Sequence, residues 1–339
     1  MIVDRYYYSQ LNKREQAIYK AFYDGVQSHK DIIPIPVKGI FTQDMFTRIF
    51  MAITRDNPLI YYLNQSACNM ATDAFGRSAI CPQYFFSKEK VSEYNKKIES
   101  AVNGLVEQLN LTEGSDYDKT IKVHDWFCEN ISYDEKGKDV NDPVRLIASH
   151  NIIGVFAHHK AQCEGIAKAV KVLLNTVDVR CIVATGDACS ERENGPHAWN
   201  IVKLDNTPYH IDVTWDIGSV TSANYKNSYD YFNVSDDIIS IDHKAYDELP
   251  KCKSLELNYF TKNKLVFNSK IQLLAYIGKA LASGKTEFYF RVEGKLNQVE
   301  AIKEVNQVIS AFMAGKGKNS IRFQHMVNDV VRTCYVKFL

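Results

Sequence analysis

A lone cysteine stands directly before a stretch that has the spacing of an α-helix. Cys163 precedes apolar residues that recur at helical intervals over 166–174, and no proline interrupts them. The first turn of a helix lies at the positive end of the helix dipole, which favours the thiolate, the nucleophilic form of cysteine. His197 and Asp212 follow later in the chain. Together the three side chains could perform acyl transfer without a metal: a thiolate attacks a carbonyl, an imidazolium protonates the leaving amine, and a carboxylate orients the imidazole.

The histidine and the aspartate lie in two segments that are typical of a β-hairpin. Residues 197–204 and 208–215 have the alternation expected of strands, and the turn residues 205–206 separate them. Another strand is expected at 179–185, followed by a polar loop over 187–195. The periodicity therefore changes from helical to strand-like after the Cys163 helix.

The predicted hairpin brings the side chains of His197 and Asp212 close together. A turn centred between residues 205 and 206 places His197 opposite Thr214 and Asp212 opposite Trp199, with all four on one face of the sheet. His197 and Asp212 are then diagonal neighbours, within reach of each other. The opposite, apolar face is expected to be buried in the core.

The N-terminal part is expected to be mostly helical. Asn12 can cap a helix, and Glu15 completes a capping-box pattern. A second helix is expected at 43–54, ended by an Asn-Pro pair. Two short segments, 59–63 and 84–86, have β-like composition.

Three domains are expected from these patterns. The accessory segment 1–88 precedes a central domain, 89–250, in which helices are predicted at 88–110, 116–130 and 142–151. The third domain, 251–339, shows a β-α-β-α-β-β order. Its strands are predicted at 264–267, 287–292, 321–327 and 330–338, and its helices at 271–282 and 298–314. The fold class is therefore α+β.

The composition is that of an ordinary globular chain. Of 339 residues, 45% are hydrophobic and 24% are charged, and the net charge is +1, so nucleic acid is not expected as a partner. The eight cysteines are scattered without a C-x-x-C pair, which favours free thiols in a reducing compartment over a disulfide framework or a zinc site. We expect no metal and no cofactor.

The start of the sequence has no basic segment followed by an apolar core, so a signal peptide is not predicted. No stretch approaches the ~18 consecutive apolar residues of a membrane-spanning helix. These observations predict a cytoplasmic protein without a membrane span; the alternative is a secreted or surface protein whose leader has been removed.

The segments around the three residues resemble the transglutaminase-like superfamily, in the same order along the chain. The similarity covers roughly residues 95–245, about the size of one domain. The matching segments are CEG at 163–165, GPHAWNIV at 195–202 and YHIDVTWD at 209–216, together with KVHDWFCENISYD at 122–134, and YFNVS at 231–235 and Asp242-His243, which resemble the bacterial branch.

This resemblance implies a papain-like core, in which a helix carrying Cys163 packs on an antiparallel sheet carrying His197 and Asp212. It also implies a catalytic triad of these three residues. Activities in the superfamily include cross-linking of glutamine to lysine, peptide hydrolysis and glycan-related amide cleavage. Some members that have lost the triad act as interaction modules.

We predict a cysteine hydrolase that acts on a peptide or protein, because bacterial relatives of this type look more like hydrolases. An acidic calcium loop of the D-x-D-x-D-G kind, the mark of a calcium-switched cross-linker, is absent from the sequence. The alternatives are a protein-glutamine γ-glutamyltransferase and a non-catalytic binding protein on the same fold.

Four further residues are candidates to line the cleft: Gln162, Trp199, His158 and His159. Gln162 stands where bacterial relatives often have a small or β-branched residue, and its amide is a candidate oxyanion donor. Trp199 is a candidate pocket wall. The two adjacent histidines closely precede the cysteine.

Overall fold

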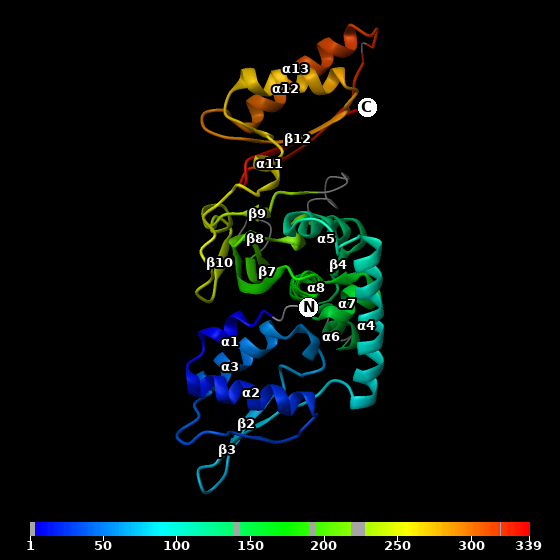
Figure 1. The fold of residues 1–339 in the computed structure, drawn as a ribbon. Coiled ribbons are helices and arrows are strands. Elements are labelled where there is room, and N and C mark those ends of the chain that lie inside the picture. The colour runs from blue at the N-terminus through cyan, green and yellow to red at the C-terminus, as the bar shows by residue number, and fades with distance from the viewer. Residues whose placement is uncertain (1–3, 138–142, 190–193, 218–227, 319) are drawn as a thin grey trace.

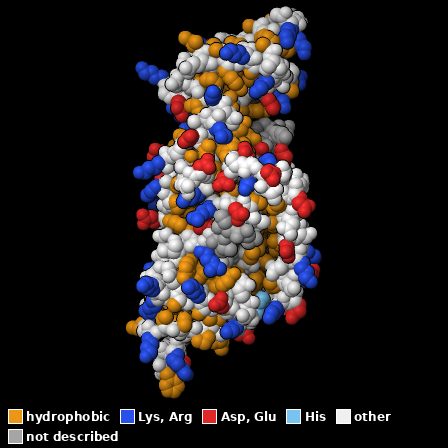
Figure 2. Space-filling view, viewed as in Figure 1, with side chains coloured by type: hydrophobic (Ala, Val, Ile, Leu, Met, Phe, Trp, Pro, Cys, Tyr) orange, Lys and Arg blue, Asp and Glu red, His pale blue; other side chains and the backbone are white. Residues whose placement is uncertain are grey.

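The computed structural model describes residues 4–137, 143–189, 194–217, 228–318 and 320–339. The N-terminal helices lie at one end of the molecule, a five-stranded sheet with its helices lies in the middle, and a smaller sheet with its own helices lies at the other end (Figure 1). Basic and acidic side chains are interspersed on the face shown in Figure 2. Within the described ranges, no helix is both long and apolar enough to cross a bilayer.

The N-terminal part combines helices with a small antiparallel sheet. Its elements are α1 (Tyr6–Gln10), α2 (Lys13–Gln27), α3 (Gln43–Asp56), the 3-10 helix η1 (Pro58–Ile60), and strands β1 (Ile33–Pro34), β2 (Asn69–Thr72) and β3 (Ser78–Cys81), in the sheet order β1-β3-β2. The predicted capping box is confirmed, because Asn12 and Glu15 each accept from the other's backbone N–H over 3.0 Å.

Of the predicted β-like segments at 59–63 and 84–86, only one residue in each forms a β-bridge, and residues 58–60 are helical. Pro58 begins the 3-10 helix instead, since proline lacks the N–H that a ladder needs and its fixed φ suits a first helical turn. Leu63 and Tyr84 form an isolated bridge. The strands β2 and β3 lie between these segments and were not predicted.

The middle part begins with helices. They are α4 (Lys88–Gln108), α5 (Asp116–Asn130), α6 (Pro143–Ser149), α7 (Ile152–His158) and α8 (Cys163–Thr176), with the short parallel pair β4 (Ser132–Tyr133) and β5 (Lys160–Ala161). The predicted helices at 88–110 and 116–130 are confirmed. Asp142, the first residue predicted for the third helix, lies outside the described residues. Helix α7 was not predicted, and the Asn151 side chain caps it by accepting from Ile153 N.

The central sheet is antiparallel and has the order β10-β6-β7-β8-β9. Its strands are β6 (Arg180–Cys189), β7 (Asn194–Leu204), β8 (Thr207–Ile211), β9 (Phe232–Val234) and β10 (His243–Ala245), with α10 (Asp236–Ile239) between the last two. The predicted hairpin turn is confirmed: Asp205 and Asn206 have φ of 47° and 64°, as a two-residue hairpin turn of type I′ requires. The predicted register is also confirmed, with Leu204 opposite Thr207.

Two predicted boundaries in this sheet are wrong. The segment 187–195 is not a loop throughout, because β6 continues to Cys189, which pairs with Asn194 at the start of β7. The strand predicted at 208–215 ends at Ile211, and residues 213–217 are helical. The reason is that Asp212 caps this helical turn: its Oδ1 accepts from Trp215 N at 3.1 Å. The opposed pairs predicted for His197 and Asp212 therefore do not form.

Helix α8 lies in the centre of the apolar core. Its residues Ile166, Ala169, Val170, Leu173 and Leu174 are at most 1% exposed. They belong to one apolar cluster that also contains buried side chains of α2, α3 and α5. The N-terminal helices thus share a continuous core with the helix that begins at Cys163.

The C-terminal part has its own core and the predicted β-α-β-α-β-β order. After α11 (Tyr259–Lys262) come β11 (Val266–Phe267), α12 (Lys270–Ala282), β12 (Glu287–Val292), α13 (Gln298–Ala314), β13 (Phe323–Asn328) and β14 (Thr333–Phe338), in the sheet order β11-β12-β14-β13. Buried residues of α12 and α13 pack on those of β12 and β14. The mixture of helices and sheets confirms the α+β class.

Candidate active site

The thiol of Cys163 is placed by the start of α8. Cys163 is the first residue of the helix, Gln162 is its N-cap, and the cysteine is only partly buried. The backbone N–H groups of a first helical turn have no acceptors within the helix. They are therefore candidates to bind an oxyanion beside the thiol.

A close contact at Gly165 holds this helix start against the chain that precedes it. A Cβ at Gly165 would lie 2.5 Å from the Ser149 carbonyl oxygen and 2.9 Å from that of Asn151. Both neighbours are backbone atoms, which cannot move aside as a flexible side chain could. Glycine is therefore required here by packing between α8 and the end of α6.

Replacing Gly165 with alanine is expected to lower the free energy of unfolding by about 1–3 kcal/mol, the usual cost of overpacking. In an unobstructed helix the same change stabilises by up to about 1 kcal/mol. Gly104 in α4 provides the matched control, because a Cβ there meets no atom within 4 Å. Urea unfolding of both variants measures the difference. Two shifts of the same sign and size would contradict the packing argument.

The side chains of His197 and Asp212 meet in the buried part of the site. The Nε2–H of His197 donates to Asp212 Oδ2 over 2.7 Å, and both side chains are 0% exposed. His197 comes from β7, and Asp212 directly follows β8. The register of the hairpin brings these positions close, and the cap at Asp212 then sets the direction of the carboxylate.

The second ring nitrogen of His197 remains available. Its Nδ1 is buried and makes no hydrogen bond of normal geometry within the described part of the chain. Burial alone would lower the pKa of His197, but the charge and hydrogen bond of Asp212, aided by Cys163, raise this pKa to about 10. Cys163 is thus one of the groups that favour the charged form of His197.

The pKa of Asp212 lies well below its usual range. Burial of the carboxyl would raise this pKa, but the charge and hydrogen bond of His197 outweigh burial, and His243 adds to their effect. At neutral pH the pair is therefore an imidazolium and a carboxylate.

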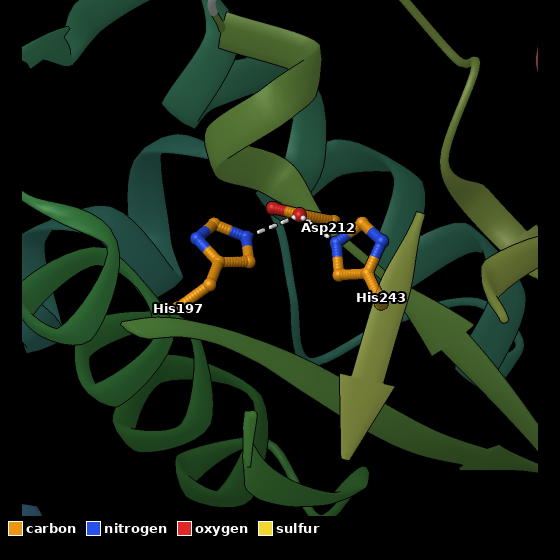
Figure 3. Close-up of side chains that lie close together, drawn as sticks. All are labelled: His197, Asp212 and His243. Carbon is orange, nitrogen blue, oxygen red and sulfur yellow. Dashed lines mark hydrogen bonds and ion pairs between the residues drawn. The ribbon is translucent and has the colours of Figure 1, made fainter. Parts of the chain in front are cut away.

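A second imidazole binds the same carboxylate oxygen, as Figure 3 shows. His243 Nε2 lies 2.9 Å from Asp212 Oδ2, and His243 Nδ1 lies 2.7 Å from Asp242 Oδ1. Asp242 and His243 lie in a segment that resembles the superfamily, but the sequence predicts no role for either. The hairpin register could not place His243, because it lies on β10, which pairs with β6 at the far edge of the sheet from β8.

The other predicted cleft residues have different surroundings. Gln162 is buried, and its Nε2 donates to the Asp134 carbonyl oxygen over 3.2 Å. Trp199 is 2% exposed, donates from Nε1 to His210 Nδ1 and stacks beside the His197 ring. Trp199 is therefore part of the wall behind His197.

His158 and His159 are exposed at the end of α7. His159 contacts the ring of Trp126. The structure shows no contact of either residue with His197 or Asp212 in the described ranges.

A further buried cluster fixes the helical turn that follows Asp212. His124 Nε2 lies 3.0 Å from Asp216 Oδ2 and 3.7 Å from Cys128 Sγ. Asp216 Oδ1 also accepts from Ser228 Oγ. Since Asp216 N donates to the Asp212 carbonyl oxygen, this cluster links α5 to the turn that carries the carboxylate.

Among the described residues, two groups of side chains have the composition of metal ligands, with candidate ligand atoms within 4.8 Å of one another: His197, Asp212 and His243, and His210, Asp236 and Cys252. In the first group the two imidazoles already bind Asp212 Oδ2 by hydrogen bonds. An ion there would replace these bonds and occupy His197.

Comparison with known proteins finds a family model for the part of the chain that holds these residues. Residues 103–213 match the family model described as "Transglutaminase-like superfamily". This range contains Cys163, His197 and Asp212. Residues 103–213 belong to the transglutaminase-like superfamily.

Two curated proteins to which part of this chain is similar are kyphoscoliosis peptidases. The Mus musculus protein is 25% identical over 161 residues, which covers 43% of this chain and 23% of that protein. The Homo sapiens protein is 24% identical over 160 residues, which covers 42% and 22%. The matched region thus spans less than a quarter of either relative. A crystal structure of a TGase is 15% identical, with a TM-score of 0.30, over 54% of this chain and 50% of that chain.

Proposed function

We propose that this chain is a cysteine-dependent acyl-transfer enzyme that hydrolyses peptide or amide bonds. Cys163 is the nucleophile, His197 is the general acid and base, and Asp212 is the carboxylate that orients and stabilises the imidazolium. The superfamily match supports the class of chemistry, and the name of the kyphoscoliosis peptidases favours hydrolysis.

The orientation of the His197 ring carries the proposal. Its Nε2 is bound to a buried carboxylate over 2.7 Å, whereas its Nδ1 is buried without a normal hydrogen bond. A buried nitrogen without a hydrogen-bond partner destabilises the fold by about 1–3 kcal/mol, so a partner for Nδ1 is expected. A thiolate at Cys163 would supply the missing acceptor for an Nδ1–H.

The reaction follows from these positions. The Cys163 thiolate attacks the carbonyl carbon, and a C–S bond forms while the carbonyl oxygen becomes an oxyanion that the N–H groups at the start of α8 stabilise. The C–N bond then breaks, and the Nδ1–H of His197 protonates the leaving amine. In the second half, His197 Nδ1 takes a proton from water, the hydroxide attacks the thioester, and the C–S bond breaks to release a carboxylic acid and the thiolate.

An unfolded, glutamine-containing protein incubated with a labelled primary amine tests the proposal. We expect new peptide termini that the Cys163→Ala variant does not produce, and little label on glutamine. Cys163-dependent incorporation of the amine without cleavage would replace hydrolysis by cross-linking. If neither cleavage nor amine incorporation occurs and Cys163 is unreactive, the proposed enzyme is contradicted and a binding role remains.

A further inference from the structure

We propose that His243 is a positioning residue of the active site, which holds Asp212 between two imidazole donors and limits the basicity of His197. The inference rests on the proposed function, since it assigns a role within the same site. It is carried by the arrangement in Figure 3, in which Asp212 Oδ2 lies between the Nε2 atoms of His197 and His243, at 2.7 Å and 2.9 Å.

The hydrogen bonds of His243 indicate its charge. Its Nε2 faces Asp212 and its Nδ1 faces Asp242, both within 2.9 Å. An ionised carboxylate can only accept, so each ring nitrogen must carry a hydrogen, and a ring with two N–H groups is an imidazolium. Burial opposes this charge, but the two carboxylates outweigh burial and raise the pKa of His243.

Asp242 stabilises the positive charge of His243, so this charge does not have to be balanced by Asp212. Its Oδ2 accepts from Tyr231 Oη over 2.5 Å, and its Oδ1 is left for His243. Asp242 and His243 therefore form a buried ion pair that is neutral as a whole and turns its positive end toward Asp212. The negative charge of Asp212 remains the counter-charge of His197.

The aromatic rings packed around His243 come from β7, from the helical turn after Asp212 and from the residue before β9. His197 on β7 and Trp215 on the turn after Asp212 lie with ring centres 5.2 Å and 4.4 Å from that of His243, and Tyr231 before β9 lies at 5.7 Å. Burial lowers the pKa of His210 on β8, and the positive charge of His243 adds a smaller effect in the same direction. Apart from Asp212 and Asp242, these neighbours are imidazoles or uncharged rings.

Two consequences follow for His197. Because Asp212 Oδ2 accepts from two donors at once, neither ring can draw the carboxylate out of line. Because the second donor is positive, the proton of His197 is held less tightly than it would be beside an unshared carboxylate. His197 can then release its proton to a leaving amine and still remain charged near neutral pH.

NMR of the full chain with 15N-labelled histidine tests the inference. At pH 7 we expect both ring nitrogens of His243 to be protonated. In His243→Gln, which retains an N–H donor but not the charge, we expect the His197 Nε2–H signal to move downfield and the deprotonation midpoint of His197 to rise by about one pH unit. His197→Gln assigns the signals.

His210→Gln is the matched control, because His210 is also a buried imidazole of this sheet but bonds to Asp236 instead of Asp212. It is expected to leave the His197 midpoint unchanged. A His197 midpoint that is the same in His243→Gln as in the wild type would overturn the inference. So would a wild-type His243 with one protonated nitrogen, which decides the matter even if the variant does not fold. Neither readout needs activity, so an inactive wild type with an unreactive Cys163 would contradict the proposed function alone.

Discussion

Replacing Asp212 with asparagine is expected to slow alkylation of Cys163 by iodoacetamide at neutral pH by on the order of 10²- to 10⁴-fold. The reason lies in the direction that the new amide must take. Asp212 Oδ1 accepts from Trp215 N and caps the helical turn after it. The amide oxygen retains this bond, so the NH2 group stands in the place of Oδ2 and faces the Nε2 atoms of His197 and His243.

The amide group reverses the proton on His197. Because an amide N–H needs an acceptor, Nε2 of His197 must give up its hydrogen, and the remaining proton lies on Nδ1, toward Cys163. An imidazole in this tautomer cannot take the proton of the thiol. The thiolate–imidazolium pair that the proposed mechanism requires is thereby lost, while the thiol itself stays in place.

Mass-spectrometric mapping of the alkylated peptides measures this effect. Cys189 is exposed and provides a reference thiol within the same molecule. The expected result is a large fall in the rate at Cys163 and an unchanged rate at Cys189. A ratio of the two rates that is the same in the wild type and in Asp212→Asn would refute this use of the carboxylate.

The largest loss of stability is expected from Asp216→Ala, at about 3–5 kcal/mol of the free energy of unfolding. The Asp216 side chain is 0% exposed and binds His124 Nε2, Ser228 Oγ and Tyr231 N. Alanine would leave all three donors buried without this acceptor. It would also release α5 from the turn that carries Asp212.

Asp125→Ala is the control for this prediction. Asp125 Oδ1 lies 3.2 Å from Nδ1 of the same histidine, but its side chain is 33% exposed, so water can replace it. A loss of less than about 1 kcal/mol is expected. Urea unfolding of the two variants measures both losses. Equal losses would contradict the claim that burial makes the contacts of Asp216 more stabilising than the contact of Asp125.

Local sequence patterns predicted much of this structure. Asn12 and Glu15 form the expected capping box, and residues 205–206 adopt the left-handed conformations that set the hairpin register. Such features depend on hydrogen bonds between near neighbours along the chain, so the residue types at a few adjacent positions predict them. The same reasoning placed Cys163 at the beginning of a helix, and it is the first residue of α8.

The end of β8 shows where such patterns mislead. Residues 208–215 alternate as a strand does, yet the chain turns into a helix after Asp212. The same residues are also compatible with a helical turn that an aspartate caps. In the structure this turn forms and buries Val213 and Asp216. The contact of Asp212 with His197 forms nonetheless, because the paired part of the hairpin ends beside both residues.

The role of His243 depends on contacts that no local pattern contains. It reaches Asp212 because β10 pairs with β6, so that residues distant in the sequence meet behind the carboxylate. The β2–β3 hairpin at 69–81 was missed for a different reason, because its strands are partly exposed and carry little apolar alternation.

The proposed role of Cys163 as the nucleophile depends most directly on the reactivity of its thiol. Native wild-type protein and its His197→Ala variant are to be alkylated near neutral pH, and the rate at each of the eight cysteines is to be determined by peptide mapping. We expect Cys163 to react fastest in the wild type, faster than the more exposed Cys189, and to lose this advantage in the variant. A Cys163 that reacts no faster than Cys189, and at the same rate without His197, would contradict its role as the nucleophile.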